Sequence, residues 1–185
     1  MIWLCSDFHF CHDKDFVWKV RGFSSVDEMN SEIVRRFNLF VKPNDIVYIL
    51  GDCMLKDNAT GIKLLGDLKG IKYLAYGNHD TNERLTLYED AHIFEDIQFG
   101  YRFKYGKYSF WLSHYPMKMG NYKDKHPTWN LSGHTHLTES IDGDNSIYNV
   151  AMDAHNCFPI SIEQIVAEIK VYRDEHPIQL FNKIK

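Results

Sequence analysis

Short runs of apolar residues punctuate the first half of the chain, at residues 2–5, 46–50 and 71–76. Each run has the length and the β-branched or aromatic content of a buried strand. Longer amphipathic stretches separate the runs, so the predicted order is strand, helix, strand, helix, strand. This order is typical of parallel βαβ units.

The helices of this half are predicted from the spacing of their apolar residues. Apolar side chains recur at intervals of three and four between residues 26 and 40, directly after the capping-box pattern formed by Ser25 and Glu28. Residues 58–68 repeat this spacing and predict a second helix, and residues 83–90 predict a short third one.

The second half of the chain has a different pattern. Residues 101–105 alternate in polarity, a Gly-Lys pair supplies a turn, and residues 108–112 return, which predicts a hairpin. A weaker apolar run covers residues 129–131, and residues 161–170 show helical spacing. Because no linker or repeat interrupts the chain, we expect one α/β domain over residues 1–185, with mixed sheets that are parallel in one half and more antiparallel in the other.

Composition limits the classes of function. Of the 185 residues, 44% are hydrophobic and 25% are charged, which supports a packed core and disfavours disordered, collagen-like and coiled-coil proteins. The net charge of −4 offers no general surface for phosphate groups, so extended nucleic-acid binding is not expected. The four cysteines form no C-x-x-C pair, which disfavours a zinc finger and a dithiol redox centre.

The chain also lacks the features of an exported or membrane-bound protein. It begins without the basic start and apolar core of a signal peptide, and no run approaches about 18 apolar residues. Scattered cysteines suit reduced thiols. We therefore expect a cytoplasmic protein with no membrane partner.

The most informative feature is the set of polar side chains that follows each predicted strand. The ends of five strands deliver two aspartates, one asparagine and five histidines, namely Asp7, His9, Asp52, Asn78, His79, His114, His134 and His136. Ligands of open α/β sheets bind beyond the carboxyl ends of the strands. Side chains at five such ends can therefore converge on one site.

These residue types indicate a metal site. Neutral imidazole, carboxylate and amide oxygen suit Mn²⁺, Fe²⁺, Zn²⁺, Co²⁺ and Ni²⁺, whereas the lack of thiolate disfavours a structural zinc centre. Seven of these side chains, taken as ligands, are too many for one tetrahedral ion. Two ions about 3.5 to 4 Å apart, sharing a bridging carboxylate, would use all seven.

The order of these motifs resembles that of the calcineurin-like metallophosphoesterase superfamily. The matching blocks are D-x-H at residues 7–9, G-D at 51–52, G-N-H-D at 77–80, the single His114, and G-H-T-H at 133–136. A lone G-D carries little information, whereas five blocks in the family's order are specific. The stretch from Asn149 to Ser161 also resembles a compact bacterial and phage-type subgroup.

This resemblance implies a four-layer αββα sandwich and a dinuclear metal centre. Three side chains would hold the first ion, three the second, and one would bridge them: Asp7, His9 and His136; Asn78, His114 and His134; Asp52. His79 would act as general acid, and Asp80 would orient its imidazole.

The implied activity is hydrolysis of a phosphoester by metal-activated hydroxide, with Mn²⁺ as the expected ion. A phosphodiester is expected over a phosphomonoester, in a small or end-bound nucleotide-like substrate, because the short chain has no second domain to grip a duplex. Two alternatives stay open: a non-catalytic metal-binding scaffold of the same fold, and a nuclease acting on nucleic-acid ends. The presence of His79 favours an enzyme, since a scaffold needs no proton donor.

Three further residues are candidates for substrate binding. His12 either lines the substrate pocket or lies in a solvated loop. Arg21 is either a phosphate clamp or a surface arginine lying over Phe23. Tyr115 precedes a lysine-bearing stretch at residues 117–128, which is either a lid or specificity loop or a solvated basic loop.

Overall fold

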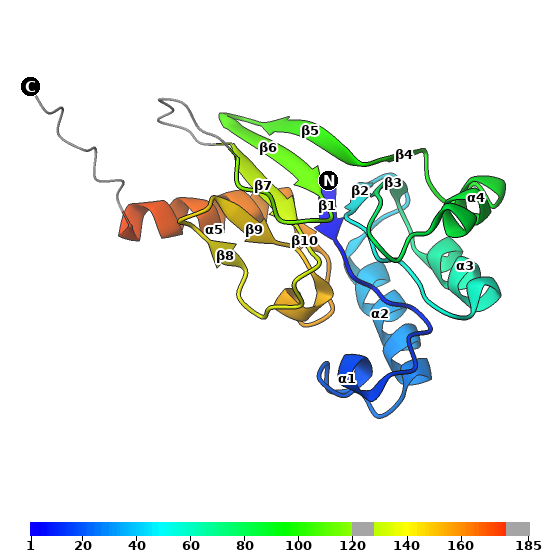
Figure 1. Ribbon diagram of the computed structural model, residues 1–185. Helices are drawn as coiled ribbons and strands as arrows, with labels where there is room; N and C mark the ends of the chain where they lie inside the picture. Colours follow the sequence, from blue (N-terminus) through cyan, green and yellow to red (C-terminus); the bar gives the residue numbers. More distant parts are fainter. Residues whose placement is uncertain (120–127, 177–185) are drawn as a thin grey trace, which may run out of the picture.

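The computed structural model describes residues 1–119 and 128–176, which form two five-stranded sheets with flanking helices (Figure 1). The first sheet has the strand order β10-β1-β2-β3-β4. Its strands are β1 (Ile2–Cys5), β2 (Ile46–Ile49), β3 (Ile71–Ala75), β4 (Asp96–Gln98) and β10 (Ile160–Ser161). Strands β1 to β4 are parallel and β10 is antiparallel, so the predicted parallel half is confirmed.

The second sheet has the strand order β5-β6-β7-β9-β8. Its strands are β5 (Gly100–Tyr105), β6 (Tyr108–Ser113), β7 (Trp129–Ser132), β8 (Ile141–Asp142) and β9 (Ile147–Asn149). The predicted hairpin is confirmed, since β5 and β6 are antiparallel and pair Tyr105 with Tyr108. The sheet as a whole is mixed, because β7 runs parallel to both β6 and β9.

All four predicted helices are present. The helices are α1 (Asp15–Trp18), α2 (Val26–Phe40), α3 (Asn58–Asp67), α4 (Asn82–Asp90) and α5 (Ile162–Glu175), with a 3-10 helix η1 (Met152–His155). Ser25 caps α2 by accepting from the Glu28 amide, while the Glu28 carboxylate accepts from the Ser24 amide. A reciprocal capping box with Ser161 and Gln164 begins α5.

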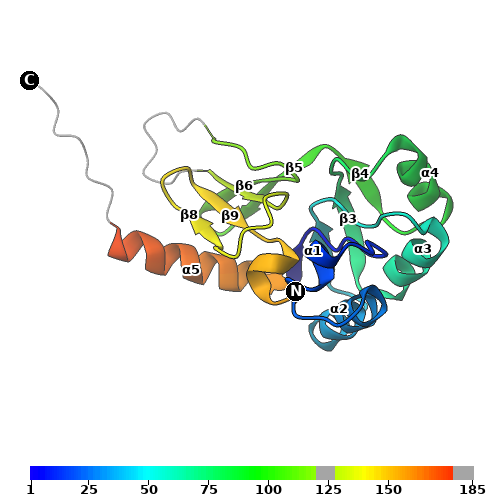
Figure 2. The ribbon, with the colours of Figure 1, turned by 60° about the horizontal axis from the view of Figure 1, so that its bottom comes forward.

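The first sheet buries both of its faces, because successive side chains of a strand point to opposite sides. Trp3, Val47 and Leu74 belong to the cluster that packs against α2, α3 and α4. Their chain neighbours Leu4 and Ala75 belong to the cluster that packs against the second sheet. Figure 2 shows α2, α3 and α4 gathered at the first-sheet end of the molecule, with α5 at the other end beside β8 and β9.

Helix α5 packs on the face of the second sheet that also meets the first sheet. The Tyr105 hydroxyl donates to Glu163 and the Tyr148 hydroxyl donates to Glu168, and both tyrosines share a face with the core of that sheet. The α/β class with two mixed sheets is therefore confirmed. Two mixed sheets with flanking helices are consistent with the metallophosphoesterase sandwich that the resemblance implies.

Within residues 1–119 and 128–176, no helix is both long and apolar enough to cross a membrane. The four cysteines are free and buried.

Candidate metal centre

The loops that follow the strands of both sheets meet in one place. The loop after β1 pairs with the loop after β2, because the Asp7 amide donates to the Gly51 carbonyl at 3.0 Å and the His9 amide donates to the Asp52 carbonyl at 3.1 Å. The second sheet joins them through the His134 amide, which donates to Asp7 Oδ2 at 3.0 Å. The predicted convergence of strand ends is therefore observed.

The backbone of these loops is held in an unfavourable conformation. Five of the seven predicted ligands have positive φ angles between 51° and 71°, namely Asp7, His9, Asp52, His134 and His136. A left-handed residue with a side chain costs roughly 1 to 2 kcal/mol, and such strain concentrates at functional sites. The surrounding hydrogen bonds aim these side chains at a common point despite that cost.

Two glycines of the motifs are required by close approach. A Cβ on Gly77 would lie 2.3 Å from Asp52 Oδ1, and one on Gly133 would lie 2.1 Å from Asp7 Oδ2. Any side chain at either position would displace a carboxylate of the site. This contact explains the leading glycine of both the G-N-H-D and the G-H-T-H motif.

Asp7, His9 and His136 form one group of potential ligands. The two imidazole Nε2 atoms lie 3.1 Å apart, and Asp7 Oδ1 lies 3.7 Å from His9 Nε2 and 3.9 Å from His136 Nε2. Asp7 Oδ2 accepts from the Ser6 hydroxyl, whereas Oδ1 is buried without a hydrogen-bond partner. A buried carboxylate oxygen without a partner is costly, so Oδ1 fits the position of a cation ligand.

Asn78, His114 and His134 form the second group. His114 Nε2 lies 2.9 Å from Asn78 Oδ1 and 3.1 Å from His134 Nδ1. His114 Nδ1 lies 2.9 Å from the Leu50 carbonyl oxygen, and this bond assigns the ring proton to Nδ1 and leaves the Nε2 lone pair for a metal. Burial and the neighbouring His114 lower the pKa of His134, which favours the neutral imidazole that a metal requires.

Asp52 lies between the two groups. Its Oδ2 atom is 3.8 Å from His9 Nε2 in the first group and 3.5 Å from His114 Nε2 in the second. Its carboxylate is buried, and Oδ1 accepts from the His79 amide at 2.9 Å. The residues present therefore fit two divalent ions in donor type and in the position of the shared carboxylate.

Asp153 orients His136, a role that the sequence did not assign. Its Oδ2 lies 2.9 Å from His136 Nδ1, and this contact raises the pKa of His136 and makes the imidazole a more basic ligand. Burial opposes ionisation of Asp153, but His136 and Arg21 outweigh it and lower the pKa of the carboxyl. The only sequence signal for Asp153 was its place in the stretch that resembles the compact subgroup.

The structure corrects both interpretations of Arg21. Its guanidinium is only 2% exposed and donates to both oxygens of Asp153 and to the carbonyls of Asp7 and Phe8. Arg21 is thus neither a phosphate clamp nor a surface residue over Phe23. It fixes the backbone that carries Asp7 and the carboxylate that orients His136.

The role expected for Asp80 is also wrong. Its buried carboxylate accepts from the amides of Asp52, Cys53 and Gly77 and from the Tyr88 hydroxyl, at 2.8 to 3.1 Å. It makes no hydrogen bond to the His79 imidazole among the described contacts. The aspartate of G-N-H-D therefore ties the loop after β3 to the loop that carries Asp52, because it follows a turn that points it inward.

His79 lies at the accessible side of the centre. Its Nε2 is 3.9 Å from Asp52 Oδ2, and its side chain is 40% exposed. The Arg84 guanidinium donates to the His79 carbonyl, and the His79 amide donates to Asp52, so the backbone is held from both sides. This arrangement leaves the imidazole partly exposed beside Asp52.

His12 and Tyr115 lie on different sides of the centre. The His12 ring is 5.5 Å from the His9 ring and has an edge-to-face contact with Phe16. Burial, with the nearby histidines, lowers the pKa of His12 to about 4, so its imidazole is neutral at pH 7. The Tyr115 ring is 4.9 Å from the His134 ring. The predicted loop at residues 117–128 lies mostly outside the described residues.

The comparison with known families agrees with this geometry. The sequence model of calcineurin-like phosphoesterases matches residues 1–156. The chain belongs to the calcineurin-like phosphoesterase family. The resemblance inferred from the five ordered motifs is thereby confirmed.

Relatives of this phosphoesterase span most of its length. An uncharacterized protein of Methanocaldococcus jannaschii is 32% identical over 91% of each chain. The Gene 66 protein of Mycobacterium phage L5 is 28% identical over 72% of this chain and 76% of its own. Among solved structures, AQ665, a protein of unknown function from Aquifex aeolicus, has a TM-score of 0.71 at 22% identity and covers 91% of this chain and 99% of its own. This last match shows a shared fold.

Proposed function

We propose that this phosphoesterase hydrolyses a phosphodiester with the help of two divalent metal ions, Mn²⁺ foremost. The ions would be held by the two groups described above, with the carboxylate of Asp52 shared. The observation that carries the proposal is the unpaired, buried Asp7 Oδ1, together with Asp52 Oδ2 lying within 3.8 Å of a histidine from each group. Bound ions would supply positive charge for the phosphate oxygens and lower the pKa of a bound water.

His79 is proposed as the proton donor to the leaving oxygen. Its imidazole is accessible while its backbone is anchored to Asp52. The ring is also 5.5 Å from the ring of His9, so the proton would be delivered beside the metal ligands. General acid catalysis of this kind is typically worth about 10² to 10⁴ in rate.

The substrate is proposed to be a small or end-bound nucleotide-like molecule. His134 and His136 are exposed, so a phosphate group can reach both ligand groups from solvent. His12, with Phe16 against its ring, borders the His9 side of the site, and Tyr115 borders the His134 side. Neutral aromatic side chains on both sides suit organic substituents of a phosphoester better than further phosphates.

Turnover of two chromogenic substrates by metal-loaded protein tests the proposal. We expect bis(p-nitrophenyl) phosphate to be hydrolysed faster than p-nitrophenyl phosphate, and hydrolysis to disappear when a chelator removes the metal. Loading with Mn²⁺, Fe²⁺, Zn²⁺, Co²⁺ or Ni²⁺ should be followed by measuring bound metal. Bound metal without turnover of either substrate would favour the scaffold alternative, and faster monoester turnover would reverse the proposed preference.

A further inference from the structure

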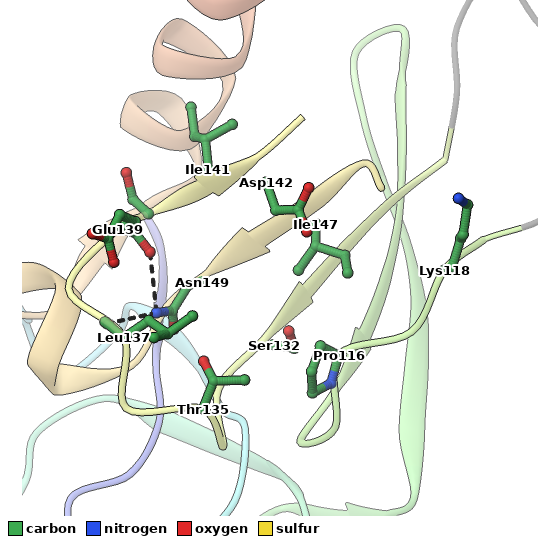
Figure 3. Close-up of a pocket in the computed structure, with 11 residues that line it drawn as sticks. Pro116, Lys118, Ser132, Thr135, Leu137, Glu139, Ile141, Asp142, Ile147 and Asn149 are labelled. Carbon is green, nitrogen blue, oxygen red and sulfur yellow. Dashed lines mark hydrogen bonds between the residues drawn. The ribbon is translucent and has the colours of Figure 1, made fainter. Parts of the chain in front are cut away.

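A cavity of about 370 Å³ lies beside the metal centre on the outer face of the second sheet. Figure 3 shows Ser132, Ile147 and Asn149 between two walls, one carrying Pro116 and Lys118 and the other carrying Thr135 and Leu137. Small-molecule sites usually occupy about 300 to 1,000 Å³, so the cavity is large enough for part of a ligand.

The walls of this cavity are continuous with the metal centre. Thr135 stands between His134 and His136 in the chain, so its Cα lies about 3.8 Å from the Cα of each of these predicted ligands. On the opposite wall, Pro116 directly follows Tyr115, whose ring is 4.9 Å from the His134 ring. Two walls of the cavity therefore begin one residue along the chain from His134, His136 and Tyr115.

Two buried asparagines hold the walls in place. Asn149 Nδ2 donates to the carbonyls of Leu137 and Glu139 at 2.9 and 3.3 Å, as the dashed lines in Figure 3 show. Asn130 Oδ1 accepts from the Met117 amide at 2.6 Å, which fixes the segment that carries the other wall. The cavity is thus pre-formed by the protein itself, as ligand sites usually are.

The lining of the cavity favours an uncharged, partly apolar group. Leu137 is 55% exposed, and Ile141, Ile147 and Pro116 add apolar surface. The charged residues that line the cavity are one lysine, Lys118, and two acids, Glu139 and Asp142, so their formal charges sum to −1. A second phosphate would meet repulsion there, whereas a nucleoside-sized group can bury apolar surface and use the hydroxyl and amide groups.

We propose that this cavity binds the non-leaving substituent of a phosphodiester and accepts an uncharged, nucleoside-sized group. The inference rests on the proposed function, since it places the phosphate at the metal ligands. His79 contacts the ring of His9, whereas the cavity adjoins His134 through Tyr115, so the two substituents of a diester have separate places. A phosphomonoester would leave the cavity empty.

The experiment compares two diesters that share a p-nitrophenolate leaving group. One is the p-nitrophenyl ester of thymidine 5′-phosphate, and the other is methyl p-nitrophenyl phosphate. Because only the non-leaving group differs, the ratio of their kcat/KM values reports on the cavity. We expect the wild-type protein to favour the thymidine ester by about tenfold or more.

Ile147→Trp should fill the cavity and lower this ratio at least about fivefold, with the loss mostly in KM. Leu137→Ala should lower the ratio by removing an apolar wall, which gives a second variant if the tryptophan prevents folding. Leu39→Trp is the matched control, because Leu39 is 61% exposed on α2, and it should keep the wild-type ratio.

The outcomes separate the two proposals. If neither diester is hydrolysed by metal-loaded protein, the proposed function fails. If both are hydrolysed equally well, or if the preference survives both Ile147→Trp and Leu137→Ala, the subsite is overturned while the phosphodiesterase stands.

Discussion

Replacing Asp80 by asparagine tests whether this residue builds the metal centre or assists His79. The carboxylate receives four hydrogen bonds, from the amides of Asp52, Cys53 and Gly77 and from the Tyr88 hydroxyl. Asparagine keeps one accepting oxygen and replaces the other with an NH₂ group. Two of the four donors therefore lose their acceptor, and at least one of these is a backbone amide.

The size of the effect follows from this count. Hydrogen bonds to a charged group contribute about 1.5 to 3 kcal/mol each, so losing two removes about 3 to 6 kcal/mol. Two terms offset part of the loss. The NH₂ group can donate to the Tyr88 oxygen, and the variant no longer buries a charge, whose desolvation raises the pKa of Asp80. We expect the free energy of unfolding to fall by about 2 to 4 kcal/mol, a large part of the usual 5 to 15 kcal/mol.

Urea unfolding at neutral pH, with a chelator present, measures this difference without any contribution from bound metal. The variant should also bind less metal at a given concentration, because the Asp52 loop is released. Asp67→Asn is the matched control, since the half-exposed Asp67 side chain forms an ion pair with the exposed Lys63 on the surface of α3, and it should be neutral. Unchanged stability and metal content in Asp80→Asn, with a lower kcat, would refute the reasoning and return Asp80 to a role in proton transfer.

Four further variants follow from the geometry. Asp52→Ala should remove most bound metal together with activity, because both ligand groups lose their shared carboxylate; unchanged metal stoichiometry by elemental analysis would contradict the bridge. His79→Ala should keep its metal and lower kcat most for substrates with poor leaving groups. The control His92→Ala, at an exposed position, should match wild type. Loss of metal from His79→Ala would make His79 a ligand instead. Arg21→Ala should reduce the free energy of unfolding by about 3 to 5 kcal/mol, measured in urea, because it leaves the buried carboxylate of Asp153 without its cationic partner. A raised KM at full stability would restore a substrate role for Arg21. The pKa of Asp45 is lowered from 3.8 to about 2, chiefly by the amino group of Met1, so its stabilisation is present above pH 4 and is lost as the pH falls toward 2. Asp45→Asn should therefore weaken the fall of Tm between pH 4 and 2, and an identical pH profile would count against this ion pair.

The sequence predicted those helices and strands whose apolar runs or capping residues lie within the element itself. Strands β1, β2 and β3 and helices α2 and α5 carry apolar runs or caps that the sequence displays, and each begins within one residue of its expected start. Strands β8 and β10, of two residues each, were missed, because so short a strand has no periodicity of its own. These strands exist because β9 and β1 provide their hydrogen-bond partners.

The same distinction holds for the metal centre. The order of the motifs identified the seven potential ligands, because each follows a strand whose carboxyl end lies at the same edge. Asp80 and Arg21 were assigned to the wrong partners, and the role of Asp153 was missed. The hydrogen bonds from Arg21 to Asp153 and from the Asp52 and Cys53 amides to Asp80 span 27 to 132 residues, and no local motif encodes such distances.

The sequence by itself determined the α/β class, the family and the residue types that gather at the strand ends, because these depend on periodicity and on the order of short motifs. Only the tertiary structure decided which side chains face a substrate and which hold the loops. A buried polar group must be paired, and its partner is chosen by packing between distant segments. The fold therefore turns Arg21 and Asp80 inward as supports for the ligands, and leaves His79 and the cavity beside Thr135 open to solvent.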